Sequence, residues 1–147
     1  MSDAVLTDAQ VADFRALAGM IIPASAQYGV PGADDPVIFA DIVGSVGRDH
    51  GAVVAALARA AEVAGGAVAG LDAAGKAAVV ATLQGEAGAM GVLVRLVLLC
   101  YYRDDRVMVS LGLEPRAPFP KGHVLEQGDW SLLDPVKARK PFWRAAP

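Results

Sequence analysis

Residues 89–102 read AMGVLVRLVLLCYY and form the most apolar stretch of this 147-residue chain. A segment with apolar side chains on nearly every side is typical of a helix in the interior of a protein. Arg95 interrupts the run, and the stretch is shorter than the roughly 20 residues that a bilayer span requires. It therefore predicts a buried, central helix and no membrane span.

The first helix expected in the chain begins after Thr7. Thr7 and Gln10 have the spacing of a capping box, in which each side chain accepts a hydrogen bond from the other residue's backbone N–H. The helix should end just before Pro23. Asp13 and Arg15 should point toward water. The apolar side chains that recur at helical spacing and should face the core are Phe14, Leu17, Ala18 and Ile21.

Three more helices are expected before the apolar stretch. Asp35 can cap the second helix, with Pro36 at its first position, where the missing N–H costs nothing. The third should run over residues 50–64, up to a Gly-Gly pair, and Asp72 can cap the fourth. The apolar positions expected to line these helices are Ile38, Phe39, Ile42, Val43, Val46, Val79, Val80 and Leu83.

Glycine recurs at three-residue spacing just before and within the apolar stretch, as Gly85, Gly88 and Gly91. Because glycine destabilises helices, this recurrence predicts either a helix break or a face where another backbone comes close. After the apolar stretch, Asp104 can cap a short sixth helix, and Gly112 has the position of a left-handed C-cap.

These patterns predict an all-α fold, a small bundle of about five or six helices with a long irregular C-terminal tail. Six of the nine prolines and both tryptophans lie in residues 113–147. We expect a helical domain over residues 1–112 and an extended tail, rich in proline and aromatic residues, over residues 113–147. The tail either belongs to the same domain or wraps on a partner.

The charge of the chain argues against nucleic-acid binding. The net charge is −3, whereas nucleic-acid binders usually present a basic face to the phosphates. Residues 1–112 hold 7 of the 13 basic and 12 of the 16 acidic residues, and residues 113–147 hold 6 and 4. A mildly basic tail favours docking on an acidic protein surface, which its own domain could equally provide.

None of the reactive side chains has the partners that catalysis or metal binding needs. His50 and His123 are far apart, and neither has a Cys, His or carboxylate partner at a metal-ligand spacing. Cys100 lies in the apolar stretch, where a small buried thiol is expected. Arg95 should form an ion pair inside the protein or at an interface. We therefore expect no catalytic, cofactor-binding or metal-binding residue in this chain.

The tail has the composition of a protein-binding segment. Trp, Tyr and Arg dominate binding hot spots because each buries a large area and keeps a polar group. Residues 129–135 (DWSLLDP) predict a local turn or short helix start that presents two leucines in a fixed direction. The aromatic rings either pack on the chain's own domain or bind a partner. The expected partner contacts are Tyr101, Tyr102, Phe119, Trp130, Arg139, Phe142, Trp143 and Arg144.

Two groups of short segments occur at opposite ends of the helical domain. The first comprises residues 16–23 (ALAGMIIP), 32–33 (GA) and 37–41 (VIFAD), and the second comprises Tyr101-Tyr102, Val107, Leu111-Gly112 and residues 120–122 (PKG). Taken together and in this order, they resemble the gluconate 2-dehydrogenase subunit 3 family.

The resemblance implies a non-catalytic small subunit, which is not an enzyme on its own. Members of that family partner a large FAD-containing dehydrogenase of the glucose–methanol–choline type, which oxidises sugars or other alcohols. Some complexes add a cytochrome c subunit. The small subunit is needed for maturation, stability or export of the large one, so FAD is expected in the partner and not in this chain.

Many family members carry a twin-arginine export leader, and residues 1–8 (MSDAVLTD) do not resemble one. This difference predicts a cytoplasmic location, or a periplasmic one if the large subunit carries the signal. Two other functions stay open. One is a self-contained helical enzyme or small-ligand binder with a pocket near Arg95 and the two adjacent tyrosines. The other is a structural homo-oligomer that packs through the glycine-spaced face.

Overall fold

The computed structural model describes residues 5–86, 88, 90–117, 119, 121–122 and 124–140. Within these ranges the regular elements are all helical, and the only β-type pairing is an isolated bridge between Ser25 and Val30. The prediction of an all-α fold is therefore confirmed. The chain divides into two compact units, which we call the body (Met1–Pro115) and the tail (Arg116–Pro147).

The body begins with α1 (Asp8–Ile21), and the expected capping box is present. The Thr7 hydroxyl accepts a hydrogen bond from the Gln10 N–H at 3.3 Å, and the Gln10 side chain accepts one from the Thr7 N–H at 2.9 Å. Of the expected core residues, Phe14, Leu17 and Ala18 are fully buried. The start of the helix is thus determined by residues only three positions apart.

The prediction that Asp13 points toward water is wrong. Asp13 is only 7% exposed, and its carboxylate accepts a hydrogen bond from the Ala69 N–H at 2.8 Å. Ala69 belongs to a short 3₁₀ helix, η2 (Val68–Gly70), that contacts α1 and was not expected from the sequence. A helical turn leaves its first N–H groups without partners inside the helix, and Asp13 satisfies one of them.

The next two helices begin as predicted, but α2 ends at Gly44, so Val46, expected on that helix, lies just beyond it. In α2 (Pro36–Gly44), the Asp35 side chain accepts hydrogen bonds from the first N–H groups, and proline occupies the first turn. A 3₁₀ turn, η1 (Gly47–Asp49), leads into α3 (His50–Ala64). Helix α3 ends at Gly65, which has φ 67°, a left-handed conformation that favours glycine.

The three glycines before α5 mark a helix break. Helix α4 (Ala73–Gln84) ends at Gly85, and α5 (Gly91–Tyr101) starts at Gly91. Between them, Gly88 has φ 81°, which is incompatible with a continuous helix. Helix α6 (Asp105–Ser110) follows, capped by Asp104, and Gly112 has the expected positive φ, 73°.

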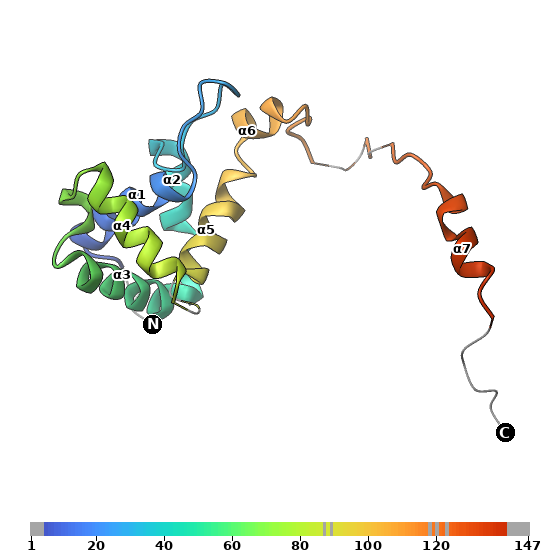
Figure 1. Cartoon of the computed structure of the whole chain (residues 1–147). Coiled ribbons are helices and arrows are strands. Elements are labelled where there is room, and N and C mark those ends of the chain that lie inside the picture. Colours follow the sequence, from blue (N-terminus) through green and yellow to red (C-terminus); the bar gives the residue numbers. More distant parts are fainter. Residues whose placement is uncertain are drawn as a thin grey trace. The chain divides into compact units, whose positions relative to one another are not determined.

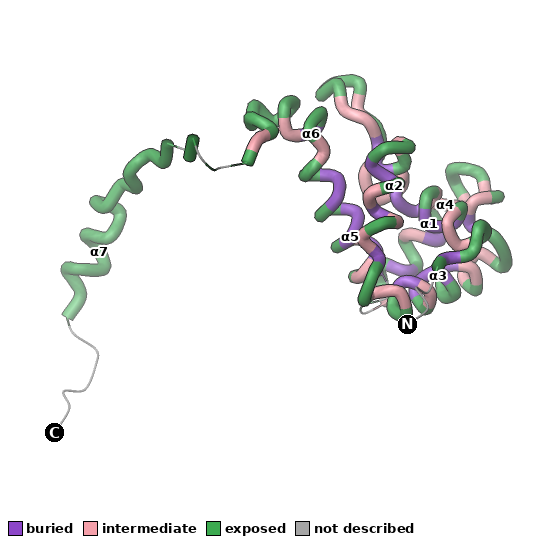
Figure 2. The backbone as a smooth tube through the Cα atoms, turned by 180° about the vertical axis from the view of Figure 1, so that it is seen from behind, coloured by how far each residue is buried: buried purple, intermediate pink, exposed green. Residues whose placement is uncertain are grey.

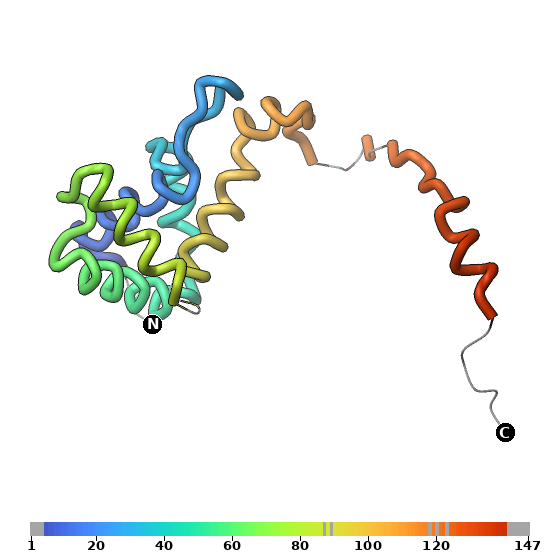
Figure 3. The backbone as a smooth tube through the Cα atoms, in the orientation of Figure 1, coloured from blue at the N-terminus to red at the C-terminus, as the bar shows by residue number. Residues whose placement is uncertain are grey.

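Helix α5 contacts α1, α2 and α3, as expected of a central helix. Figure 3 follows the chain from α1 to α5, and Figure 2 shows the buried stretches of these helices in purple. Leu93, Leu96 and Val97 are at most 1% exposed, whereas Leu98 and Leu99 are 40% and 53% exposed. One side of α5 is therefore not covered by the described part of the body.

The tail contains η3 (Trp130–Leu133) and α7 (Asp134–Lys137), the latter labelled in Figure 1. The side chain of Asp129 accepts a hydrogen bond from the Ser131 N–H at 3.0 Å, which confirms the predicted helix start. None of the described tail residues is buried. The tail therefore has no hydrophobic core over its described ranges.

Across the described ranges, no helix combines the length and the apolar character needed to span a lipid bilayer.

Candidate interaction surface

A groove of about 300 Å³ opens on the body where the loop after α1 meets the end of α5 and α6. We call it the tyrosine groove. Its walls include Pro23, Tyr28, Tyr101, Tyr102, Val107 and Leu111. Figure 1 shows the segments that contribute these side chains. The loop lining ends at Val30 and the lining from α5 and α6 begins at Tyr101, 71 positions later in the sequence. The fold thus gathers aromatic and apolar side chains from both ends of the helical region.

The two adjacent tyrosines in this groove have different roles. Tyr101 is 4% exposed, and its hydroxyl donates a hydrogen bond to the Pro31 carbonyl at 3.1 Å. Burial raises the pKa of the Tyr101 phenol. Tyr102 is 53% exposed, and its ring meets that of Tyr101 edge-to-face, with centroids 5.3 Å apart. Tyr101 therefore supports the wall of the groove, and we no longer expect it to be a main partner contact. The ring of Tyr102 is accessible to solvent and stays an expected contact.

Tyr28, a residue that the sequence interpretation missed, also lines the groove and is 69% exposed. Paired backbone hydrogen bonds between Ser25 and Val30, of 3.0 and 3.1 Å, close the loop that carries it. At Gly32 the returning chain passes close to the backbone at Ala24. A side chain would not fit there, since an added Cβ would lie 2.9 Å from the Ala24 nitrogen. Tyr28 lies in a loop, where no helical periodicity identifies the exposed side chains. The only signal in the sequence is its position shortly before the Pro31-Gly32 turn.

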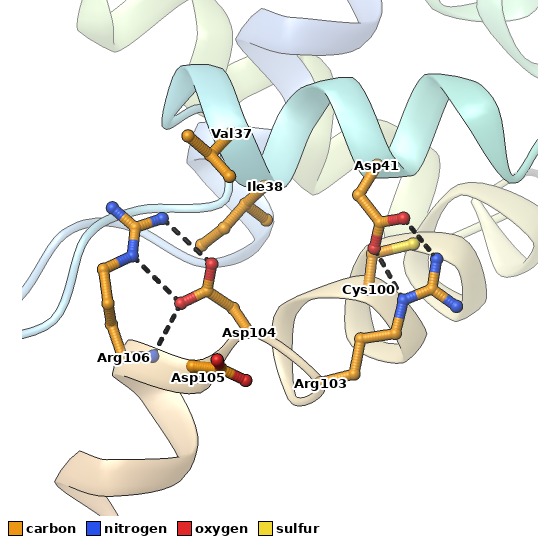
Figure 4. A pocket seen from close by; sticks show the side chains of 8 residues that line it. All are labelled: Val37, Ile38, Asp41, Cys100, Arg103, Asp104, Asp105 and Arg106. Carbon is orange, nitrogen blue, oxygen red and sulfur yellow. Dashed lines mark hydrogen bonds and ion pairs between the residues drawn. The ribbon is translucent and has the colours of Figure 1, made fainter. Parts of the chain in front are cut away.

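Arg106 holds the helices next to the groove together. Its guanidinium pairs with Asp35 at 2.8 Å and with Asp104 at 3.0 Å, the residues that cap α2 and α6. Figure 4 shows the arginine bound to Asp104 beside the start of α2. Hydrogen bonds from Arg106 lower the pKa of both carboxyls. One guanidinium therefore bridges the carboxylates of two helix caps that are 69 positions apart in the sequence.

A second ion pair joins the end of α5 to the middle of α2. Arg103 donates to the Asp41 carboxylate at 2.6 Å and to the Ser45 hydroxyl at 2.7 Å, and the first interaction lowers the pKa of Asp41. A hollow of about 380 Å³ lies between this pair and Arg106 (Figure 4). Both arginines that line it already pair with carboxylates, so the hollow favours a structural role over binding of an anion.

We expect the body to become less stable as the pH falls below the ordinary aspartate pKa of 3.8. The folded-state pKa values of Asp35, Asp41 and Asp104 lie below that value, so their ion pairs contribute fully above it. This contribution is lost as the pH falls through 3.8 and then through the lower folded-state values. Thermal unfolding measured over this range should show a weaker pH dependence for Arg106→Gln. The matched control Arg48→Gln, an exposed arginine in η1, should keep the wild-type dependence, and equal curves for both variants would contradict the assignment.

The remaining candidate side chains have structural environments. Arg95 pairs with Asp49 at 2.7 Å, which confirms the expected ion pair, and Cys100 is buried, with burial raising the pKa of its thiol. The Nε2 atom of His50 is buried without a hydrogen-bond partner among the described residues, and His123 lies outside them. The described ranges contain no group of three or more residues that could hold a metal ion.

Arg95 and the two tyrosines do not share a pocket. Arg95 borders a different, apolar hollow of about 650 Å³ between α4 and α5, where Leu98 and Leu99 are exposed. Arg95 and the tyrosines suggested for one ligand pocket thus line two different hollows. Gly88 and Gly91 also border this hollow, and a Cβ added at either would meet open space.

The tail residues expected at an interface are exposed where the structure describes them. Phe119 is 86% and Trp130 67% exposed, and Arg139 is also exposed. The other three expected contacts, Phe142, Trp143 and Arg144, lie outside the described residues.

Comparisons of this chain with profiles of known protein families, with curated proteins and with solved structures find no match. The residues and their geometry therefore carry the functional argument.

Proposed function

We propose that this chain is a non-catalytic small subunit that binds and stabilises a larger FAD-dependent sugar or alcohol dehydrogenase of the glucose–methanol–choline type. The tyrosine groove of the body and the tail each contribute contacts to that partner. The flavin and the oxidation chemistry belong to the large subunit. Some complexes of this type add a cytochrome c subunit.

The main support for this proposal is the position in space of the segments that resemble the family. Ile22 and Pro23 from the first group line the same groove as Tyr102, Val107 and Leu111 from the second group. Several of these side chains could serve the core, but Tyr102 and Leu111 are 53% and 56% exposed. Solvent exposure of large apolar residues around one groove is typical of a protein-binding site.

Two further apolar side chains near the end of the body are exposed. Val109 in α6 and Leu113, three residues after α6, are 60% and 53% exposed. Exposed aromatic and aliphatic side chains of this size are the usual anchors of interfaces, because burying them against a partner releases a large hydrated area. Exposed side chains of this kind are expected of a small subunit whose apolar surface is covered only when it binds its partner.

The proposal is tested by affinity capture of the tagged full chain from its native cells. We expect a large protein with flavin absorbance to be retained, to be identified by mass spectrometry as a dehydrogenase, and to lose solubility when the small chain is absent. Dehydrogenase activity should be found in the complex, and the small chain purified alone should show none.

Leu111→Asp and Leu99→Asp form a matched pair for the groove. Both leucines are about half exposed, at 56% and 53%, but Leu111 lines the tyrosine groove and Leu99 lines the α4–α5 hollow. We expect Leu111→Asp to weaken binding of the flavoprotein by at least about 30-fold, the effect of a hot-spot residue, and Leu99→Asp to change it little. The opposite order would move the interface to the α4–α5 side.

A further inference from the structure

Residues 129–140 of the tail form a short recognition element, which we call the docking segment. Its order comes from local polar interactions and not from a core. The Asp129 carboxylate accepts hydrogen bonds from the Ser131 N–H at 3.0 Å and the Ser131 hydroxyl at 2.6 Å. Lys137 pairs with Asp134 at 3.3 Å within α7, where proline occupies the first turn. A segment that is capped in this way loses less entropy when it binds.

The docking segment carries an apolar stripe. Trp130 and Leu133 are three positions apart in η3, whose helix has about three residues per turn, so both side chains lie on one side. Val136 follows after three more positions in α7. The three side chains are 67%, 42% and 54% exposed. The segment therefore presents three apolar side chains, spaced by three positions each, to solvent.

Charge along the docking segment is polarised. Asp129 and Asp134 lie in its first half, and the second half contains Lys137, Arg139 and Lys140. This order also agrees with the helix dipole, which favours acidic residues at the start of a helix and basic residues at its end. The complementary surface has an apolar floor and carboxylates at the end that receives residues 137–140.

We propose that the docking segment inserts Trp130, Leu133 and Val136 into an apolar groove of the large flavoprotein whose far end is acidic. The inference depends on the proposed function and names the binding mode of the tail.

The full-length chain provides the test, with the flavoprotein captured above as the probe. Leu133→Asp is compared with Leu125→Asp, which makes the same substitution in the same tail at a residue 85% exposed and outside the stripe. We expect Leu133→Asp to raise the dissociation constant at least about 30-fold and Leu125→Asp to change it less than about threefold. Added salt should weaken wild-type binding, because the basic end faces carboxylates.

Tryptophan fluorescence reports the insertion directly. The chain has two tryptophans, so Trp143→Phe leaves Trp130 as the only tryptophan of this chain. Because Trp143 is itself an expected contact, the affinity of this variant is measured first, and the emission of the flavoprotein alone is subtracted from that of the complex. The remaining signal is that of Trp130. Its emission should shift to shorter wavelength when the flavoprotein is added, because the ring leaves water. An unchanged emission in a complex that still forms would overturn the inference.

Each other outcome is also decisive. If the wild-type chain binds the flavoprotein and Leu133→Asp binds equally well, the docking mode is wrong and the proposed function stands. If the wild-type chain binds no flavoprotein, both fail. A Leu133→Asp variant that lowers the unfolding temperature of the chain alone would assign the stripe to the chain's own body. A variant that converts an oligomer of the chain alone to a monomer would assign it to a second copy.

Discussion

Phe14→Ala is expected to lower the free energy of unfolding by about 3–5 kcal/mol, the loss found when a large aromatic side chain is removed from a close-packed core. Phe14 is fully buried on α1, and its ring meets the Phe39 ring of α2 edge-to-face, with centroids 5.7 Å apart. The substitution leaves a cavity between two helices. Urea unfolding followed by circular dichroism measures the effect.

Phe119→Ala is the matched control, since it makes the same substitution at a tail residue that is 86% exposed. We expect it to change the free energy of unfolding by less than about 0.5 kcal/mol. Domains of this kind are stable by only about 5–15 kcal/mol, so a loss of the expected size at Phe14 removes a large part of the total. A loss below about 1 kcal/mol at Phe14 would mean that α1 and α2 do not pack through this ring.

Asp13→Ala is expected to destabilise the body by about 1–3 kcal/mol, because it leaves the Ala69 N–H of η2 without its acceptor in a largely buried site. Most of this cost comes from the unsatisfied donor. Asp13→Asn retains a carbonyl oxygen at the same position and should recover much of the lost stability.

Hydrogen exchange separates the hydrogen bond from a general effect on the helix. The Ala69 amide should exchange faster in Asp13→Ala than in Asp13→Asn, while amides in the middle of α3 should report only the change in overall stability. Equal exchange of the Ala69 amide in the two variants would show that the carboxylate serves another purpose.

The starts and ends of helices were predictable because the interactions that define them are local. The capping box of α1 joins Thr7 and Gln10, and Asp72 accepts a hydrogen bond from the Gly75 N–H at the start of α4. Gly65 and Gly112 end helices with a positive φ that glycine adopts without a Cβ clash. Each of these signals needs only a few consecutive residues.

The tyrosine groove was only partly predictable. The sequence indicated an aromatic pair at the end of α5, but both tyrosines had the same features as hot-spot residues. The hydrogen bond from Tyr101 to the Pro31 carbonyl, 70 positions away, decides that Tyr101 is covered and Tyr102 is not. Helical periodicity states which side chains share a face, and it does not state which neighbouring element covers that face.

By itself, the sequence determined the all-α class, the positions of the helix caps and the capped start of the docking segment, because these depend on contacts within a few positions. Only the tertiary structure decided that Asp13 is an internal acceptor, that Arg106 joins the caps of α2 and α6, and that Tyr28 faces the groove beside Tyr102. These three features depend on segments that are distant in the chain and that packing of the apolar helices brings together.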